Sequence, residues 1–197
     1  MTSTSTTNIV TVEDPPLAHA LFSTTQYAWL WLVLRVWIGY VWLTEGIAKL
    51  TNPAWTGEHA GAAITSFATN ALGKTTGPHP DVAGWYAAFL TNAVIPHAAF
   101  WSYAITLGEL FVGIGLILGI FTGIAAFCAV LMNFNYLLAG SVSINPLLLP
   151  PALFLILAWK VAGWYGVDRY LLPALGTPWQ PAPPMPKVAR EAIDAAR

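Results

Sequence analysis

Charged residues are scarce in this chain. Only 9% of its 197 residues are Asp, Glu, Lys or Arg, whereas a soluble domain carries about a quarter. Hydrophobic residues make up 56%, and several apolar runs are long enough to cross a bilayer as helices. The net charge of -1, without a basic face on any predicted element, argues against a nucleic-acid-binding protein. The composition instead predicts a small multi-pass protein of the lipid bilayer.

Cysteine is almost absent as well. Because Cys128 is the only one, an intrachain disulfide and a CxxC redox pair are excluded. No histidine falls within a predicted span, which disfavours a membrane haem held by two axial histidines. His59, His79 and His97 lie in one polar connection without the spacing of metal ligands, so we predict no metal site. The chain carries no motif for a covalently bound cofactor.

The apolar runs predict an all-α fold. Four membrane spans are expected, at residues 27–50, 100–121, 124–141 and 147–167. The connections after the second and third spans are short, which forces neighbouring helices to run antiparallel. The fold class we predict is therefore a four-transmembrane-helix antiparallel bundle, with one long extracytoplasmic connection after the first helix.

That connection, residues 51–97, is too polar and too interrupted to span the membrane. Each half is expected to form a short helix at the membrane interface, with Trp85, Tyr86 and Phe89 in the headgroup region. A re-entrant segment over residues 83–94 is the alternative. The three histidines fall within this connection.

Both tails are predicted to lie outside the membrane domain, which spans residues 27–172. Residues 1–26 are rich in Ser and Thr and are expected to be disordered. Residues 173–186 are proline-rich and predicted to be extended, and residues 187–197 resemble a short surface helix. The basic residues flanking the last span place both termini in the cytoplasm. They are Arg169, Lys187, Arg190 and Arg197.

The first span carries ionisable residues on a helical face. Such residues are costly in hydrocarbon, so they normally turn inward and find partners. Glu45 lies one turn before Lys49, where the two can pair, and Asn135 of the third span is expected at a similar depth. The residues that share the face are Arg35, Gly39, Trp42, Gly46 and Lys49.

Glycines are predicted to bring helices close together. Gly39 and Gly46 lie on the charged face of the first span, where they leave room for another backbone. Gly115 and Gly119 form a G-x-x-x-G pair in the second span, which predicts a second close approach.

Each residue of a helix adds about 1.5 Å of rise. Counted from the ends of their spans, Arg35, Glu109 and Asn133 all lie near the middle of the membrane, where we expect them to meet. Lys160 lies nearer the inner surface and is expected to extend its ammonium group to it. Two interpretations of these polar groups remain open. They hold the helices in register, or they bind a ligand and carry protons.

Three segments resemble the DoxX/DoxD family of four-helix bacterial membrane proteins: RVWIGYVWLTEGIAKL from Arg35, GELFVGIGLILGIFTGIAAFCAVLMNFN from Gly108, and AGWYGVD, which ends at Asp168. The resemblance implies a redox-associated subunit in the bacterial cytoplasmic membrane. The best-understood relatives are the membrane subunits of thiosulfate:quinone oxidoreductase, which pass electrons from thiosulfate to a membrane quinone. It also implies that other membrane-protein subunits are partners.

Two hypotheses for the function follow. In the first, the chain interacts with a quinone, Arg35 and Lys49 donate to the quinone carbonyls, and Glu45 or Glu109 relays protons. In the second, it is a non-catalytic accessory subunit that stabilises or assembles a larger respiratory or photosynthetic complex. The candidate ligand-binding residues are Arg35, Trp42, Glu45, Lys49, Glu109, Asn133 and Asn135.

Overall fold

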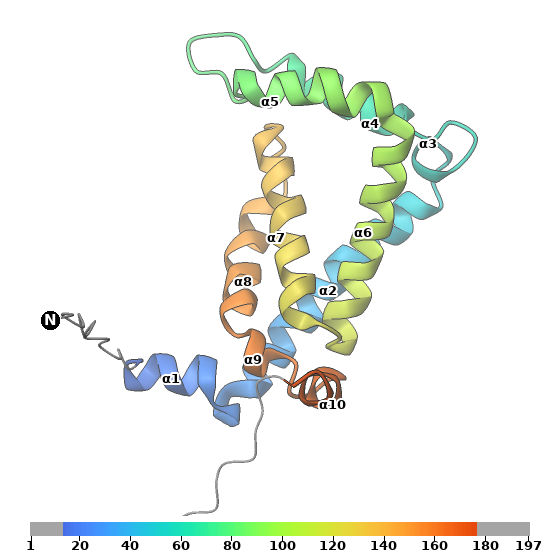
Figure 1. Ribbon diagram of the computed structural model, residues 1–197. Helices are drawn as coiled ribbons and strands as arrows, with labels where there is room; N and C mark the ends of the chain where they lie inside the picture. The colour runs from blue at the N-terminus through green and yellow to red at the C-terminus, as the bar shows by residue number, and fades with distance from the viewer. Residues whose placement is uncertain (1–13, 177–197) are drawn as a thin grey trace, which may run out of the picture.

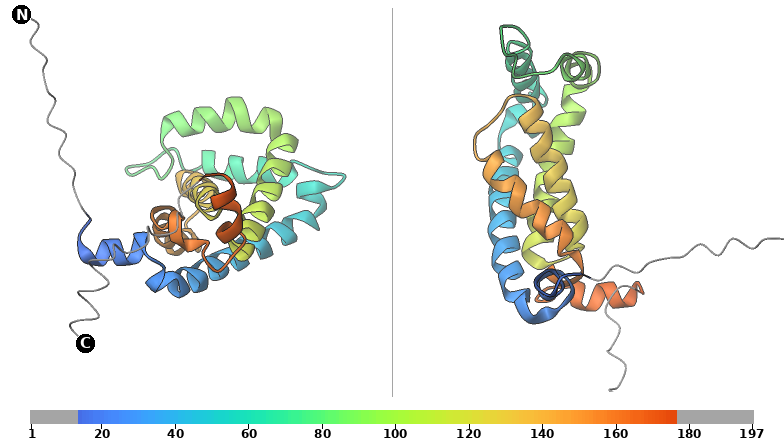
Figure 2. Two further views of the ribbon diagram at one scale, coloured as in Figure 1. Left: turned by 60° about the horizontal axis from the view of Figure 1, so that its bottom comes forward. Right: turned by 90° about the vertical axis from the view of Figure 1, so that its left-hand side faces the viewer.

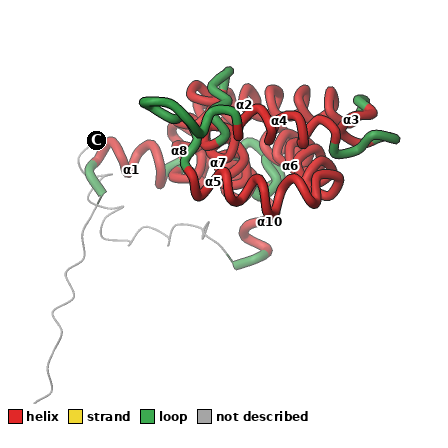
Figure 3. The backbone as a smooth tube through the Cα atoms, turned by 90° about the horizontal axis from the view of Figure 1, so that it is seen from above, coloured by secondary structure: helices red, strands yellow, loops and turns green. Residues whose placement is uncertain are grey.

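The computed structural model describes residues 14–176. The elements in this part of the chain are all helical, and no strand occurs among them (Figure 3). The predicted all-α class is therefore confirmed. Four helices lie side by side (Figure 1), and they are α2 (Ala28–Leu50), α6 (Ala98–Leu118), α7 (Thr122–Leu138) and α8 (Asn145–Leu157).

The four helices differ in length. The helical segments Thr25–Leu50 and Gly84–Leu118, which contain α2 and α6, are long and apolar enough to cross a membrane, whereas α7 and α8 are apolar but shorter. The predicted fourth span is interrupted, because α8 ends at Leu157 and a one-turn helix, α9 (Trp159–Ala162), follows it. The arrangement of four spans thus remains a prediction.

Two glycines let the segment after α9 pack closely against its surroundings. A Cβ on Gly163 would collide with the Asp168 side chain, and one on Gly166 would lie 2.7 Å from the carbonyl oxygen of Leu118. The segment after α9 therefore folds tightly against the turn between α6 and α7, with backbone hydrogen bonds from Val167 and Asp168 to that turn.

The closest helix pair is α2 with α6. A Cβ on Gly113 would lie 2.6 Å from the backbone nitrogen of Leu43, and one on Gly46 would lie 2.9 Å from the backbone nitrogen of Leu110. The predicted role of Gly46 is thus confirmed. The predicted G-x-x-x-G pair is confirmed only at Gly115, where a Cβ would lie 3.2 Å from Ala125 of α7. Gly119 lies outside the helix, since it follows the end of α6 in a left-handed conformation with φ of 66°.

Residues 53–97 form a mostly helical layer across one end of the four helices (Figure 1), which we call the cap. Its helices are α3 (Pro53–Thr56), α4 (Ala62–Leu72) and α5 (Gly84–Phe89). A π-helical turn at Leu90–Val94 and a 3-10 turn at Ile95–His97 join α5 to α6. The short helix predicted in each half of the long connection is present as α4 and α5, and its place at a membrane interface remains a prediction.

The cap has its own apolar core with the end of α7. Ile64, Val82 and Leu90 are buried together with Ala139. Tyr86, predicted in the headgroup region, is instead 4% exposed. Its hydroxyl donates to the backbone carbonyl of Asn135 at 3.0 Å. This hydrogen bond ties the cap to α7.

Short helices occupy the opposite end of the molecule (Figures 1 and 2). They are α1 (Pro16–Ser23), the 3-10 turn Thr25–Tyr27, α9 and α10 (Asp168–Ala174). The indole nitrogen of Trp31 donates to the Leu21 carbonyl at 2.9 Å, and its ring stacks on Phe22. These contacts hold α1 against α2.

The predicted boundaries of both tails need correction. Residues 16–23, placed in a disordered tail, form α1, and the contacts of Trp31 with Leu21 and Phe22 give the reason. Pro173, placed at the start of an extended segment, lies inside α10. The predicted helix at residues 187–197 lies outside the described residues.

Candidate functional site

Glu109 of α6 is a buried carboxylate held between two donors. Its side chain is 1% exposed, and its Oε2 atom lies 2.8 Å from Lys49 Nζ of α2. Its other oxygen accepts a hydrogen bond from the Tyr136 hydroxyl of α7 at 2.6 Å. Three helices thus each supply one side chain, and the ammonium group and the phenol stabilise a carboxylate that burial would otherwise penalise.

Lys49 also connects Glu109 to the surface. Its Nζ atom lies 3.3 Å from Glu45 Oε2, which confirms the pair predicted from the one-turn spacing. The side chain of Glu45 is 62% exposed, whereas that of Lys49 is 13% exposed. A row of ionisable groups therefore leads from a fully buried acid to the outside of the protein.

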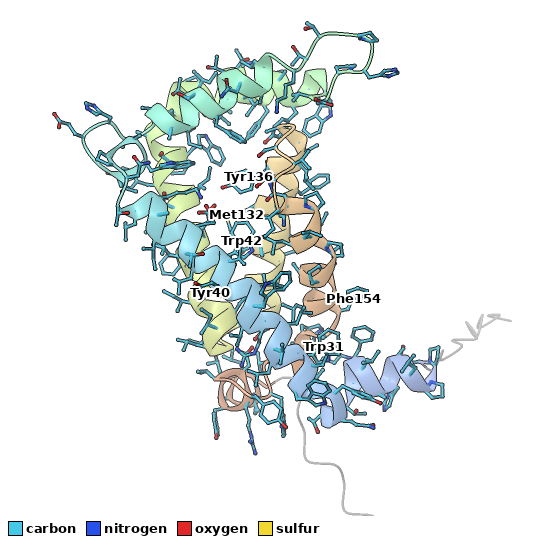
Figure 4. All side chains as sticks on the ribbon, turned by 180° about the vertical axis from the view of Figure 1, so that it is seen from behind. Trp31, Tyr40, Trp42, Met132, Tyr136 and Phe154 are labelled. Atoms are coloured by element: carbon cyan, nitrogen blue, oxygen red, sulfur yellow. The ribbon has the colours of Figure 1, made fainter. Side chains whose placement is uncertain are left out.

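These side chains line a cavity of about 190 Å³, which we call the polar pocket. Trp42 lines it too, and this ring is stacked on Tyr136 with 6.5 Å between centroids. The Trp42 indole nitrogen is buried and has no hydrogen-bond partner among the described residues. Figure 4 shows Trp42, Met132 and Tyr136 between the helix pairs, below the cap. Four predicted site residues, Trp42, Glu45, Lys49 and Glu109, thus meet in one pocket.

The predicted pairing of Arg35 with Glu109 is wrong. The Arg35 guanidinium donates to the backbone carbonyls of Leu116 and Ile117 at 2.5 and 2.7 Å, and to that of Tyr165 at 2.7 Å. The first two carbonyls belong to the last turn of α6, where backbone acceptors lack partners within the helix. Arg35 does not line the polar pocket.

The register of α2 against α6 explains this difference. The two helices run antiparallel, with Gly46 beside Leu110 and Gly39 beside Gly113 and Ile117. Arg35 therefore meets the end of α6, and Glu109 meets the end of α2 that carries Lys49. The prediction placed Arg35 and Glu109 at the same depth, whereas this register separates them by about three helical turns.

Asp168 completes a structural cluster with Arg35. Its carboxylate, 0% exposed, accepts hydrogen bonds from the backbone nitrogens of Phe121 and Thr122 at 2.7 and 2.8 Å. It therefore caps the beginning of α7, where backbone donors are unpaired and a negative charge is favourable. Its charge also interacts with Arg35. We call this pair, which holds the α6–α7 turn from both sides, the Arg35–Asp168 clasp.

The two predicted asparagines occupy different surroundings. Asn133 is 1% exposed, and neither atom of its amide has a hydrogen-bond partner among the described residues. Asn135 donates to the Leu131 carbonyl and accepts from the Tyr86 hydroxyl at 3.3 Å. Asn135, predicted at a depth similar to that of Glu45 and Lys49, does not line the polar pocket. Lys160 of α9 is exposed, and its predicted extension to the membrane surface remains a prediction.

Tyr136 was not among the predicted site residues. It contacts Glu109, Trp42 and Phe67, and so belongs at the centre of the site. The sequence does show a tyrosine within the apolar run of α7, three residues after Asn133. To place its hydroxyl beside Glu109, however, one must know the register between α6 and α7, which a single sequence does not provide.

A second cavity, of about 360 Å³, lies between the cap and helices α6 and α7. We call it the apolar cavity, because its lining residues are apolar except for Asn135 and the two tyrosines, Tyr86 and Tyr136. Phe67 and Tyr136 line both the apolar cavity and the polar pocket. The two spaces are therefore neighbours with a shared wall.

The fold and this buried polar site describe a small helical membrane protein. A family model, DoxX, matches residues 30–141, which is more than half of the chain. The protein therefore belongs to the DoxX family, as the sequence motifs predicted. The match includes Lys49, Glu109 and Tyr136 and ends before Asp168. Neither the curated proteins nor the solved structures contain a match.

Proposed function

We propose that this DoxX-family protein is a quinone-interacting redox subunit whose polar pocket binds the head group of a membrane quinone. The observation that carries the proposal is the Glu109 carboxylate, buried between Lys49 and Tyr136 in a pocket rather than in a packed core. Ionisable groups at such positions in membrane proteins mark ligand sites and proton paths. The redox association implied by the family resemblance supports the same function.

The chemistry of quinone reduction suits these side chains. A quinone carbonyl accepts hydrogen bonds, and Lys49, Tyr136 and the unpartnered indole nitrogen of Trp42 are donors at the pocket. Conversion of a quinone to a quinol takes up two electrons and two protons. The electrons come from a redox centre on a partner subunit. The Glu109 carboxylate takes up each proton by way of the exposed Glu45 and Lys49 and passes it to the reduced quinone.

Replacing Glu109 with glutamine tests this function, because glutamine keeps the shape of the side chain and removes its proton exchange. We expect quinone-dependent turnover of the protein with its partner subunits to fall about 100-fold or more, the size of a general acid–base contribution. Quinone binding should change much less. Turnover is followed by the absorbance change on quinol formation.

The matched control is Glu58→Gln, which makes the same change at an exposed carboxylate of the cap. This variant should keep wild-type turnover. If Glu109→Gln turns over as fast as Glu58→Gln, the proposed proton relay is refuted.

A non-catalytic accessory role is the alternative. It is favoured by large apolar side chains that α6 and α7 expose, including Phe111 at 70% and Phe127 at 56%, which lipid or another subunit would cover. In that case the chain would co-purify with a larger complex, and Glu109→Gln would leave the activity of that complex unchanged.

A further inference from the structure

The apolar cavity has the size of a ligand site. Its volume of about 360 Å³ lies within the range of about 300–1,000 Å³ for small-molecule pockets. Phe67 and Phe89 of the cap line one side, and Ile105, Leu131 and Met132 line the side formed by α6 and α7. Such a surface is suited to a hydrocarbon chain and offers few partners to a polar molecule.

Tyr136 joins this cavity to the polar pocket. Its hydroxyl binds Glu109, and its ring contacts Phe67 edge to face, with 5.9 Å between centroids. Tyr136 and Phe67 line both spaces. A molecule with a polar end beside Glu109 and an apolar end beyond Tyr136 would therefore fit the two cavities together.

The apolar cavity opens toward the face of the protein that would contact lipid. Ala104 of α6 and Leu131 of α7 line it and are themselves exposed, Leu131 to 51%. Close to them along the same helices, Leu107 and Phe134 are exposed to 44% and 51%. An apolar chain could therefore enter the cavity directly from the hydrocarbon region of the bilayer.

The charges of the polar pocket determine which kind of ligand head group it can bind. Two carboxylates, Glu45 and Glu109, face a single ammonium group, that of Lys49. An anionic phosphate placed there would be repelled by the excess negative charge. The pocket therefore favours an uncharged head group over the phosphate of a phospholipid.

We propose that the apolar cavity holds the first part of the prenyl tail of the quinone whose head group occupies the polar pocket. The substrate is thus a long-tailed membrane quinone, and Tyr136 separates its head from its tail. This inference rests on the proposed function, because it requires the quinone head to bind beside Glu109.

Photolabelling of the full chain in phosphatidylcholine nanodiscs tests the inference. Two quinone analogues are used, one with a diazirine on the ring and one with a diazirine on the second isoprene unit, and labelled residues are located by mass spectrometry. The ring probe should label residues of the polar pocket. The tail probe should label Ile105, Leu131 or Met132, and unmodified quinone should prevent both labels.

Filling the cavity provides a second measurement. Ile105→Trp should lower tail labelling in the cavity about tenfold, a loss of about 1.4 kcal/mol in binding free energy, because the larger side chain would occupy space that the tail needs. Leu107→Trp, on the same helix but exposed to lipid, is the matched control and should leave the labelling unchanged.

The outcomes separate the two proposals. Ring labelling in the polar pocket with tail labelling on outward residues such as Phe111 would overturn the tail site and leave the proposed function in place. Absence of ring labelling in the polar pocket would overturn both. A photoreactive phosphatidylcholine that labels the apolar cavity, without competition from quinone, would identify a membrane lipid as its occupant and overturn the tail site.

Discussion

Replacing Arg35 with methionine is expected to lower the free energy of unfolding by about 3 kcal/mol or more, because each of three carbonyls would lose its donor at a cost of about 1–3 kcal/mol. Methionine keeps much of the apolar volume and removes every donor. The carbonyls of Leu116, Ile117 and Tyr165 would lose their partner, and Asp168 would lose its favourable interaction with the Arg35 charge. The end of α6 and the start of α7 would loosen together.

Unfolding of the purified protein in mixed micelles, driven by sodium dodecyl sulfate and followed by circular dichroism, measures this loss. Arg169→Met is the matched control, since Arg169 is exposed and its guanidinium only lies over the Trp164 ring, 4.7 Å from the centroid. Exposed contacts of this kind contribute about 0.5–1 kcal/mol. An Arg35→Met variant as stable as Arg169→Met would show that the clasp does not stabilise the fold.

Replacing Gly113 with alanine is expected to force α2 and α6 apart. The added methyl group would lie 2.6–2.7 Å from the backbone nitrogen and Cα of Leu43, and a backbone cannot move aside as a side-chain tip can. Overpacking costs about 1–3 kcal/mol, and occasionally more. Because α2 carries Lys49 and α6 carries Glu109, separation of these helices should also weaken the quinone binding that we propose.

Gly108→Ala on the same helix separates this steric effect from helix propensity. A Cβ at Gly108 would meet only the flexible Met132 side chain, with its sulfur at 3.2 Å. Both substitutions gain about 1 kcal/mol of intrinsic helix propensity, so Gly108→Ala should be neutral or stabilising. The same unfolding titration compares the two variants. Equal stability of Gly113→Ala and Gly108→Ala would show that the close approach of α2 and α6 tolerates a methyl group.

Local patterns predicted the contacts within α2 well. Glu45 and Lys49 pair because residues four apart are neighbours on the surface of a helix, and Gly46 allows a close approach because it lies on the inward face. Both inferences use residues of a single helix, whose geometry is fixed by the backbone. The family resemblance was also predicted, because its motifs are continuous stretches of sequence.

Contacts between helices were harder to predict. Whether Glu109 meets Arg35 or Lys49 depends on the register between α2 and α6, which differs from the predicted one by about three helical turns. The packing of Gly113 against Leu43 sets that register. It depends on a complementary fit of two surfaces, which hydrophobic periodicity in one sequence does not reveal.

The short length of α8 has a consequence for the surrounding membrane. Its 13 residues rise about 20 Å, and the 17 residues of α7 rise about 26 Å, against a hydrocarbon thickness of about 30 Å. Where α7 and α8 cross the membrane, as we predict, lipids beside these two helices must compress to match them, while those beside α2 and α6 need not. The protein should therefore deform its bilayer unevenly and concentrate in thinner regions of the membrane.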